Sequence, residues 1–284
     1  MKTSTKIIGI TGGKGGTGKS TIATALAVEL AKKSKVLLVD MDADCPNDHL
    51  LLNIERKNPV TVYQRIPKWD LSKCTKCGAC ADVCETNAIV HIGGNYPMFL
   101  PQQCNGCGAC AIKCPVDAIF WDKKAVGTIY EGAGFGIDLI SSELKINEPV
   151  SEIVVEKAGE LVKKRKEKYD YILVDTAAGT HCDVISALGL CDFAIGVTEP
   201  TPLGLHDLEL IMKLLSRMGV PFEIVLNMYQ EKQDELVNNT VSKYNKTVFA
   251  KVPYKKEIMI AYSKGIPIKE KSIEKIAGWI EGLS

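Results

Sequence analysis

The sequence lacks three features that would assign it to common classes of protein. Its apolar runs fall far short of the ~20 residues that a membrane-spanning helix needs. It has no long run of Lys and Arg, and its formal net charge is only +1, so nothing indicates a nucleic-acid surface. The first residues, MKTSTKIIGITGG, show neither the apolar segment nor the cleavage site of a signal peptide. We therefore expect a cytoplasmic protein with no nucleic-acid partner and no stable membrane anchor.

The composition is ordinary except for cysteine. A chain of 284 residues, 46% hydrophobic and 24% charged, is long enough for a large α/β domain and a second, smaller one. Its 11 cysteines are unusual. In a reducing compartment, clustered cysteines indicate metal binding rather than disulfides.

A glycine-rich segment, Gly12–Ser20, follows the apolar run Ile7–Ile10 and reads GGKGGTGKS. It matches the phosphate-binding pattern GxxxxGK[ST], in which backbone N–H groups surround phosphate oxygens. Lys19 would reach the β- and γ-phosphates, and the Ser20 hydroxyl would bind Mg²⁺. The residues expected to contact ATP or ADP here are Gly13, Gly15, Gly16, Thr17, Gly18, Lys19, Ser20 and Thr21.

The order of apolar and amphipathic segments predicts an α/β fold with a mostly parallel, doubly wound sheet. Strands are expected over 6–11, 36–39, 171–174, 193–198, 222–226 and 248–252, and helices over 20–33, 150–168, 203–218 and 273–280. The glycines at 132, 134 and 136 suggest a linker.

Carboxylates follow two of these strands. Asp40, Asp42 and Asp44 come at the end of one, and Asp175 ends another in the Walker B manner. Carboxyl ends of parallel strands are where such sheets carry their chemistry. We expect Mg²⁺ or a proton-transfer role to compensate the repulsion, although a solvated acidic turn is an alternative.

The cysteines form an internal repeat with a period of 30 residues. CTKCGACADVC, Cys74 to Cys84, is followed by CNGCGACAIKC, Cys104 to Cys114, and the second run continues into Pro115 where the first has Glu85. Each run has the spacing of bacterial ferredoxins, and thiolates without histidine favour iron–sulfur clusters. Paired zinc sites or an empty remnant are alternatives.

The spacing also predicts which cysteines share a cluster, because in two-cluster ferredoxins the fourth cysteine of each run binds the other cluster. Cys74, Cys77, Cys80 and Cys114 should hold the first [4Fe–4S] cluster, and Cys104, Cys107, Cys110 and Cys84 the second. We expect a small α+β ferredoxin-like domain over 67–122, with short strands at 88–92 and 118–121, inserted between ATPase segments 1–66 and 123–284. No role is assigned to Cys45, Cys182 or Cys191.

Lys14 adds a second lysine to the phosphate-binding loop, and KGGTGKS resembles the deviant Walker A of the MinD/ParA superfamily, which includes the nitrogenase iron protein and Mrp-type ATPases. The resemblance implies a nucleotide-dependent homodimer in which Lys14 reaches the partner's nucleotide, or else Lys14 is a solvated loop residue. It further implies that Asp42 positions the attacking water, with Asp44 the second choice and a water-mediated contact to Mg²⁺.

The resemblance to this family is weaker at the positions expected to contact the adenine and after the second acidic strand. Asn227 would bond the adenine edge, and the backbone near Pro253 would complete that pocket; a turn role for Asn227 is the alternative. The chain departs from the family at Ala177 and Ala178, where two prolines are usual, and it has no late CxxC pair of the Mrp type.

Three functional hypotheses follow. The first is an ATPase, slow without its partner, that couples ATP to electron transfer through two clusters towards a metalloprotein or metallocofactor assembly system. The second is an iron–sulfur cluster assembly or carrier ATPase. The third is a MinD-like positioning ATPase.

Overall fold

The computed structural model describes residues 4–230 and 234–283, which form one large sheet and one small one. The nine strands found in the large sheet of these residues lie in the order β11-β10-β9-β1-β8-β2-β7-β6-β3. All pairs from β11 to β7 are parallel, whereas β6 and β3 are antiparallel to their neighbours. The expected mostly parallel, doubly wound α/β sheet is confirmed.

The strands of the large sheet are β1 (Lys6–Thr11), β2 (Val36–Met41), β3 (Lys57–Trp69), β6 (Ile119–Gly134), β7 (Ile137–Leu144), β8 (Tyr171–Thr176), β9 (Phe193–Thr198), β10 (Phe222–Tyr229) and β11 (Val248–Pro253). The small sheet pairs β4 (Ile89–Val90) with β5 (Met98–Phe99). The helices are α1 (Lys19–Leu30), α2 (Asp48–Leu51), α3 (Ala79–Asp82), α4 (Ala109–Lys113), α5 (Glu152–Arg165), α6 (Cys182–Leu188), α7 (Pro202–Met218), α8 (Asp234–Val241), α9 (Lys256–Ser263) and α10 (Lys271–Glu281).

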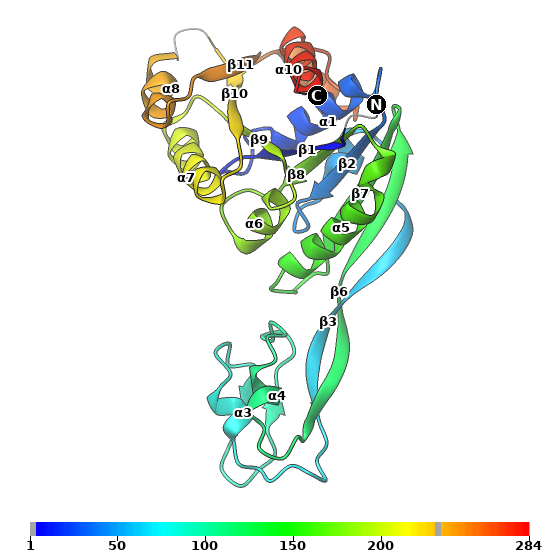
Figure 1. The fold of residues 1–284 in the computed structure, drawn as a ribbon, viewed down its shortest axis with the longest axis vertical. Helices are drawn as coiled ribbons and strands as arrows, with labels where there is room; N and C mark the ends of the chain where they lie inside the picture. The colour runs from blue at the N-terminus through cyan, green and yellow to red at the C-terminus, as the bar shows by residue number, and fades with distance from the viewer. Residues whose placement is uncertain (1–3, 231–233, 284) are drawn as a thin grey trace.

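Helices cover both faces of the parallel part of the sheet (Figure 1). Because successive strand residues point to opposite faces, Ile8 and Ile10 pack with α1 and α10, whereas Ile7 packs towards α5. Helices α6, α7 and α8 extend the second layer over β9 and β10. Helix α10 buries Ile273, Ile276 and Ile280 in the core, so its apolar face is used in packing. In the part of the chain that the structure describes, no helix is both long and apolar enough to cross a membrane.

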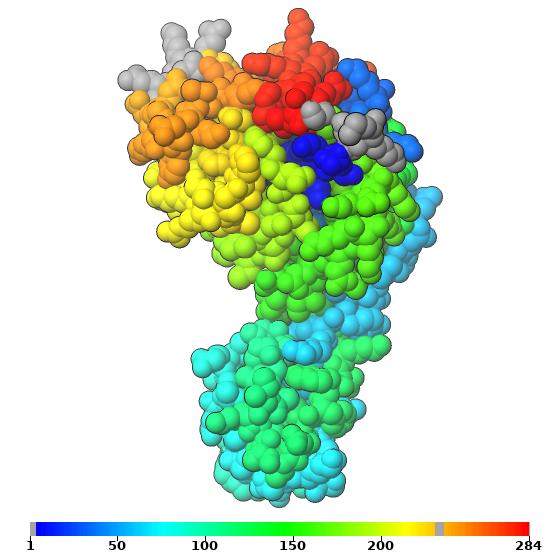
Figure 2. All heavy atoms as spheres, in the orientation of Figure 1, coloured from blue at the N-terminus to red at the C-terminus, as the bar shows by residue number. Residues whose placement is uncertain are grey.

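Strands β3 and β6 leave the body as a long twisted ribbon (Figure 1). They pair from Lys57 opposite Glu131 to Trp69 opposite Ile119. Residues 70–118 form a small unit at its tip, and Figure 2 shows a narrow neck between this tip and the body. We call 70–118 the tip.

The ribbon corrects two expectations. Gly132 and Gly134 lie in β6, opposite Leu139 and Ile137, and not in a linker. A Cβ on Gly132 would stand 2.6 Å from Ile54 Cγ2, so close packing against Ile54 explains this glycine. Segment 118–121 is no short strand of the tip, because most of it belongs to the long β6.

The expected domain boundaries at 66/67 and 122/123 fall inside β3 and β6, whose pairing continues through them. Pro59 and Pro67 both lie in β3. That strand is the last in the sheet order. An edge strand tolerates proline because its outward N–H groups need no partner.

Candidate functional site

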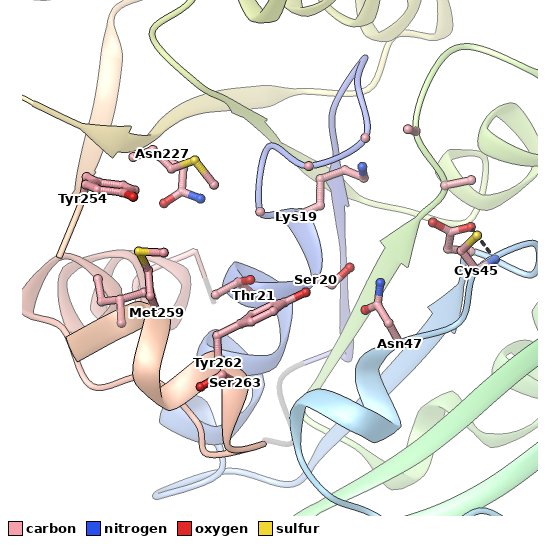
Figure 3. Close-up of a pocket in the computed structure, with 18 of the residues that line it drawn as sticks. Lys19, Ser20, Thr21, Cys45, Asn47, Asn227, Tyr254, Met259, Tyr262 and Ser263 are labelled. Atoms are coloured by element: carbon pink, nitrogen blue, oxygen red, sulfur yellow. Dashed lines mark hydrogen bonds between the residues drawn. The ribbon is translucent and has the colours of Figure 1, made fainter. Parts of the chain in front are cut away.

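A cavity of about 800 Å³ opens at the carboxyl ends of the parallel strands. Its floor is the segment from Gly15 to Thr21, and its sides come from the end of β10 and from the segments after β2, β8 and β11. Tyr254, Met259 and Tyr262 approach from the side opposite Lys19 (Figure 3). The cavity thus combines a phosphate-sized loop with a wide apolar wall.

The loop residues adopt the geometry that a phosphate-binding loop requires. Gly18 has φ +88° immediately before α1, and a Cβ there would lie 2.1 Å from Asn227 Nδ2. Asn227 Nδ2 donates to the Thr17 carbonyl at 2.8 Å. Asn227 therefore fixes the loop through the Thr17 carbonyl, a role that the sequence did not suggest. Because Nδ2 makes this bond, Asn227 Oδ1 is the atom that can accept from a ligand. Helix α1 begins at Lys19 with its N-terminus at the cavity, the end that favours anions.

Both loop lysines are engaged within this chain. Lys19 Nζ donates to the Lys14 carbonyl at 3.3 Å. Lys14 Nζ forms an ion pair with Glu199 Oε1 at 3.0 Å. The Gly179 N–H, which follows the Walker B strand β8, donates to the Gly12 carbonyl at 3.2 Å. If the Gly179 N–H bound a γ-phosphate, it would have to leave the Gly12 carbonyl. If Lys14 contacted a second subunit, its ion pair with Glu199 would have to break.

Three buried carboxyls meet at the end of β2 and β8. One oxygen from each of Asp40, Asp48 and Asp175 lies within 4.8 Å of the others. Among the described residues, neither oxygen of Asp48 or of Asp175 has a hydrogen-bond partner. Asp40 instead accepts from the backbone N–H groups of Asn47 and Asp48. Asp48 was not among the acidic residues predicted from the sequence. The feature that could have indicated it is its position eight residues after Asp40, at the start of α2.

Burial and mutual repulsion disfavour the charged forms of these carboxyls. Burial raises the pKa of Asp175 to about 7, against the lowering effects of the nearby Ser20 hydroxyl and the Lys19 ammonium. The Ser20 hydroxyl does not reach hydrogen-bond geometry with Asp175. Burial, followed by the charge of Asp175, also raises the pKa values of Asp40 and Asp48 well above their usual range. A bound divalent cation would compensate this cluster, and the adjacent Ser20 supplies a further oxygen ligand.

The other two predicted acidic residues lie nearer the cavity mouth. Asp42 is partly buried, lines the cavity and accepts from the Cys45 N–H at 3.2 Å (Figure 3). Burial raises the pKa of Asp42, with the Cys45 N–H and Lys19 opposing. Asp44 is exposed at the rim and is not a member of the buried trio. The proposed roles of both residues stay predictions.

The tip brings its cysteines together in two small cavities. The first is lined by Cys74, Cys77, Cys80 and Cys114, and the second by Cys84, Cys104, Cys107 and Cys110. The fourth cysteine of each run, Cys84 or Cys114, therefore lines the cavity of the other run. All eleven cysteines of the chain are described and none forms a disulfide.

The surroundings of these sulfur atoms suit thiolate ligands. Cys104 Sγ accepts from the Gly106 N–H at 3.4 Å, and Cys114 Sγ from the Ala118 N–H at 3.3 Å. Burial raises the pKa of Cys110 to about 11. A buried thiol with a raised pKa stays protonated unless a metal displaces the proton.

The tip is fastened to the body by a largely buried lysine as well as by the ribbon. Lys124 Nζ donates to the Pro101 carbonyl of the tip at 2.8 Å and pairs with Glu148 Oε2 at 2.6 Å. Glu148 lies between β7 and α5. Three residues on, Ser151 Oγ donates to Asp183 Oδ2 at 2.9 Å in α6, the helix that follows Gly179. These contacts, together with the chain from Glu148 to Ser151, connect the cysteine tip to α6, the helix that follows the cavity residues Ala177 and Ala178.

The remaining cysteines lie in the body. Cys45 is exposed and lines the nucleotide cavity, and Cys182 is exposed at the first residue of α6. Cys191 Sγ donates to the Ala187 carbonyl, and burial raises its pKa. Its sulfur lies where a Cβ on Gly9 would come within 3.0 Å, so Cys191 is a packing residue.

Comparison with known families assigns this arrangement. The CobQ/CobB/MinD/ParA nucleotide binding domain matches residues 8–268. The chain belongs to this CobQ/CobB/MinD/ParA family. Protein MJ0579 of Methanocaldococcus jannaschii is 34% identical to this chain over 281 residues, which cover 96% of this chain and 97% of that protein. The septum site-determining protein MinD of Synechocystis is 25% identical over 270 residues, covering 93% and 81% of the two chains.

The same fold occurs in solved family members. MinD of Pyrococcus horikoshii, complexed with Mg-ADP, aligns with a TM-score of 0.64 at 23% identity, covering 98% of this chain and 97% of that one. MinD of Pyrococcus furiosus gives a TM-score of 0.61 at 24% identity, covering 98% and 99%. At these identities the likeness shows the fold alone. The expected MinD/ParA-type nucleotide-binding fold is confirmed.

Proposed function

We propose that this chain is an ATPase that couples ATP, in a nucleotide-dependent homodimer, to electron transfer through two [4Fe–4S] clusters towards a metalloprotein or a metallocofactor assembly system. The supporting observation is that two groups of four thiols and a phosphate-binding loop belong to one chain and are linked through Lys124, Glu148 and Asp183. In this proposal residues 67–122 are the ferredoxin-like insertion between 1–66 and 123–284.

The donor sets support iron–sulfur clusters in the tip. Cys74, Cys77, Cys80 and Cys114 would hold one, and Cys84, Cys104, Cys107 and Cys110 the other. Four thiols and no histidine line each cavity, which suits iron–sulfur chemistry. When bound, such clusters take up and release single electrons.

ATP hydrolysis is assigned to residues around the body cavity. Lys19 would bind the β- and γ-phosphates, while Ser20 binds Mg²⁺. Asp175 and Asp48, whose buried oxygens lack partners among the described residues, would hold Mg²⁺ or its water. Asp42 would position the attacking water. Asn227 Oδ1 can accept from the adenine amino group because Nδ2 already donates to Thr17, and the backbone near Pro253 lines the same cavity.

Dimer formation depends on Lys14 in this proposal. Its ion pair with Glu199 would break when it contacts the nucleotide of a second copy. At the same time the Gly179 N–H would leave the Gly12 carbonyl for the γ-phosphate. Movement after Gly179 then reaches the tip through Asp183, Ser151, Glu148 and Lys124.

The test is an anaerobic redox titration followed by EPR, in nucleotide-free, ADP and ATP states, with Asp42→Ala to block hydrolysis. We expect two [4Fe–4S] signals and a nucleotide-dependent change in the potential or spectrum of at least one. Two signals that titrate identically in every state would contradict coupling through the potential. Cluster transfer to an apo-acceptor would then support the alternative of an assembly or carrier ATPase.

A second candidate, a positioning ATPase, is favoured by the relatives named septum site-determining protein MinD. It would require nucleotide-dependent binding to a surface or scaffold. The burial of the α10 apolar face in the core offers no surface for this. Nucleotide-dependent sedimentation with lipid vesicles, unaffected by loss of the cysteines, would support the positioning role over electron transfer.

A further inference from the structure

Two cross-strand pairs near the end of the ribbon each line one cysteine cavity. Trp69 and Ile119 are cross-strand partners, and both line the cavity of Cys74, Cys77, Cys80 and Cys114. Two residues closer to the body, Pro67 and Trp121 are partners, and both line the other cavity. Each group of thiols therefore lies against one tryptophan of β3 or β6.

The two tryptophans differ in what their rings do. Trp121 is 41% exposed, and the Arg65 guanidinium lies over its ring at 4.6 Å. Trp69 is partly buried and packs against Phe99, with ring centroids 5.5 Å apart. Its Nε1 atom is buried and has no hydrogen-bond partner among the described residues. An indole N–H is a donor only, and leaving it buried without a partner is destabilising.

Cys80 lines the same cavity as Trp69, and its sulfur is an acceptor on which this unused donor acts. The indole N–H falls short of hydrogen-bond geometry with the Cys80 thiol, so the donor stays unused while the thiol is protonated. A thiolate is a stronger acceptor than a thiol, because hydrogen bonds to charged groups are shorter and stronger. Cys80 becomes a thiolate when it binds iron.

We propose that the Trp69 indole N–H donates a hydrogen bond to Cys80 Sγ when the first cluster is bound, and that this bond raises the reduction potential of that cluster. This inference rests on the proposed function. Reduction adds a negative charge, so a donor aimed at a ligand sulfur stabilises the reduced state more than the oxidised one. Trp69 is then a positioning residue: by raising the reduction potential of the first cluster, it favours reduction of the cluster that lies farther from the body.

The test compares Trp69→Phe with Trp121→Phe in the full-length, cluster-loaded protein, by EPR-monitored redox titration. Phe keeps an aromatic ring against Phe99 but removes the N–H. We expect the first cluster of Trp69→Phe to be about tenfold harder to reduce at a fixed potential, about 59 mV for a one-electron couple. Trp121→Phe should leave the potential of the first cluster unchanged. An unshifted first-cluster potential in Trp69→Phe with full iron content overturns the inference.

A second measurement does not depend on how well Trp69→Phe folds. Trp121→Phe protein labelled with indole-¹⁵N tryptophan keeps only Trp69 near a cluster, because Trp279 packs against Phe193 and Phe249 in the body. Pulsed EPR of its reduced first cluster should detect a ¹⁵N coupling, and the absence of coupling overturns the inference. If the wild-type protein, with iron and sulfide supplied, yields no [4Fe–4S] signal, the proposed function itself fails. Intact clusters without the Trp69 effect overturn the inference alone.

Discussion

The body and the tip of this molecule are held together in different ways. The body buries large aliphatic side chains on both faces of its sheet, such as Ile10, Leu38 and Leu173 on one face and Val39 and Val174 on the other. In 70–118 the buried apolar residues are Ala88, Ile89, Cys104, Cys110 and Ala118, and Ile112 is 88% exposed. A unit of that size with so little core needs a covalent or metal staple. The body can therefore fold from its own packing, whereas we expect the tip to depend on a group held by its thiols.

The largest effect that this comparison predicts comes from Cys110→Ala. Cys110 is buried in the second cavity, so its loss should remove about half of the bound iron and loosen the tip, because metal-binding energy is folding energy in such units. Iron analysis and limited proteolysis within 70–118 measure this. Cys45→Ala, which alters an exposed cysteine of the body, is the matched control and should retain all iron. Cys110→Ala protein with full iron and a protease-resistant tip would contradict the dependence on thiols.

The reverse experiment breaks the body's function and leaves the tip. Lys19→Ala removes the cation that should bind the β- and γ-phosphates, and we expect ATP hydrolysis to fall at least ~100-fold, as for loss of a charge-stabilising donor. Lys33→Ala, an exposed lysine just past the end of α1, should hydrolyse ATP normally. The iron content of both variants should equal that of the wild type. Near-normal hydrolysis by Lys19→Ala would refute the assigned catalytic site.

Sequence reasoning found the parts of both regions that are encoded by short spacings. The loop from Gly13 to Ser20 and the two cysteine runs each lie within about a dozen residues, and their chemistry fixes which residue types occur. Cys84 and Cys114 each line the cavity of the other run, and their role as shared cluster ligands stays a prediction. The parallel strands were found because buried strands are continuous apolar runs.

What the sequence did not reveal depends on contacts between distant segments. Asp48 joins Asp175 only through the pairing of β2 with β8, and Lys124 meets Glu148 across the turn that follows β7. The ribbon was missed because domain boundaries were expected at 66/67 and 122/123, whereas β3 and β6 pair without a break through both positions. The glycines of β6 suggested a linker, whereas Gly132 is required by the approach of Ile54.

The buried carboxyls Asp40, Asp48 and Asp175 should make the stability of the body, but not that of the tip, depend on pH. Asp175 has a pKa near 7 in the folded body and near 3.8 when unfolded, so the unfolded state binds fewer protons between these values. The contribution of Asp175 to the free energy of unfolding of the Mg²⁺-free protein should therefore be largest below about pH 4. It should fall as the pH rises to about 7 and stay constant above that pH. Saturating Mg²⁺ should flatten the decline. Thermal unfolding of the body, followed against pH with and without Mg²⁺, measures it, and a rise in stability over that window without Mg²⁺ would contradict the cluster.

Asp48→Asn sharpens this prediction. Removing one of three buried carboxyls should increase the free energy of unfolding of the Mg²⁺-free body at pH 8 by about 1–3 kcal/mol and weaken Mg²⁺ binding. Asp44→Asn, at the exposed rim, is the matched control and should change stability by no more than about 0.5 kcal/mol. Equal effects of the two variants would remove Asp48 from the site.

The smallest expected effect tests whether body and tip are coupled at all. Lys124→Met and Glu148→Gln each break the ion pair that joins the ribbon at the Pro101 loop to the segment before α5. If the pair transmits the nucleotide state, each variant should reduce the nucleotide-dependent change at the clusters by about two- to threefold, and the double variant should be no worse than either single one. A double-mutant cycle on that change, with an interaction of about 0.5 kcal/mol expected from a two- to threefold effect, separates transmission from independent damage. The pair Lys157 and Glu160, on the exposed face of α5, serves as control, since breaking it removes a similar ion pair that touches neither site. Additive effects of the two changes would mean that the tip responds to nucleotide through the ribbon alone, because the ion pair would then carry none of the signal.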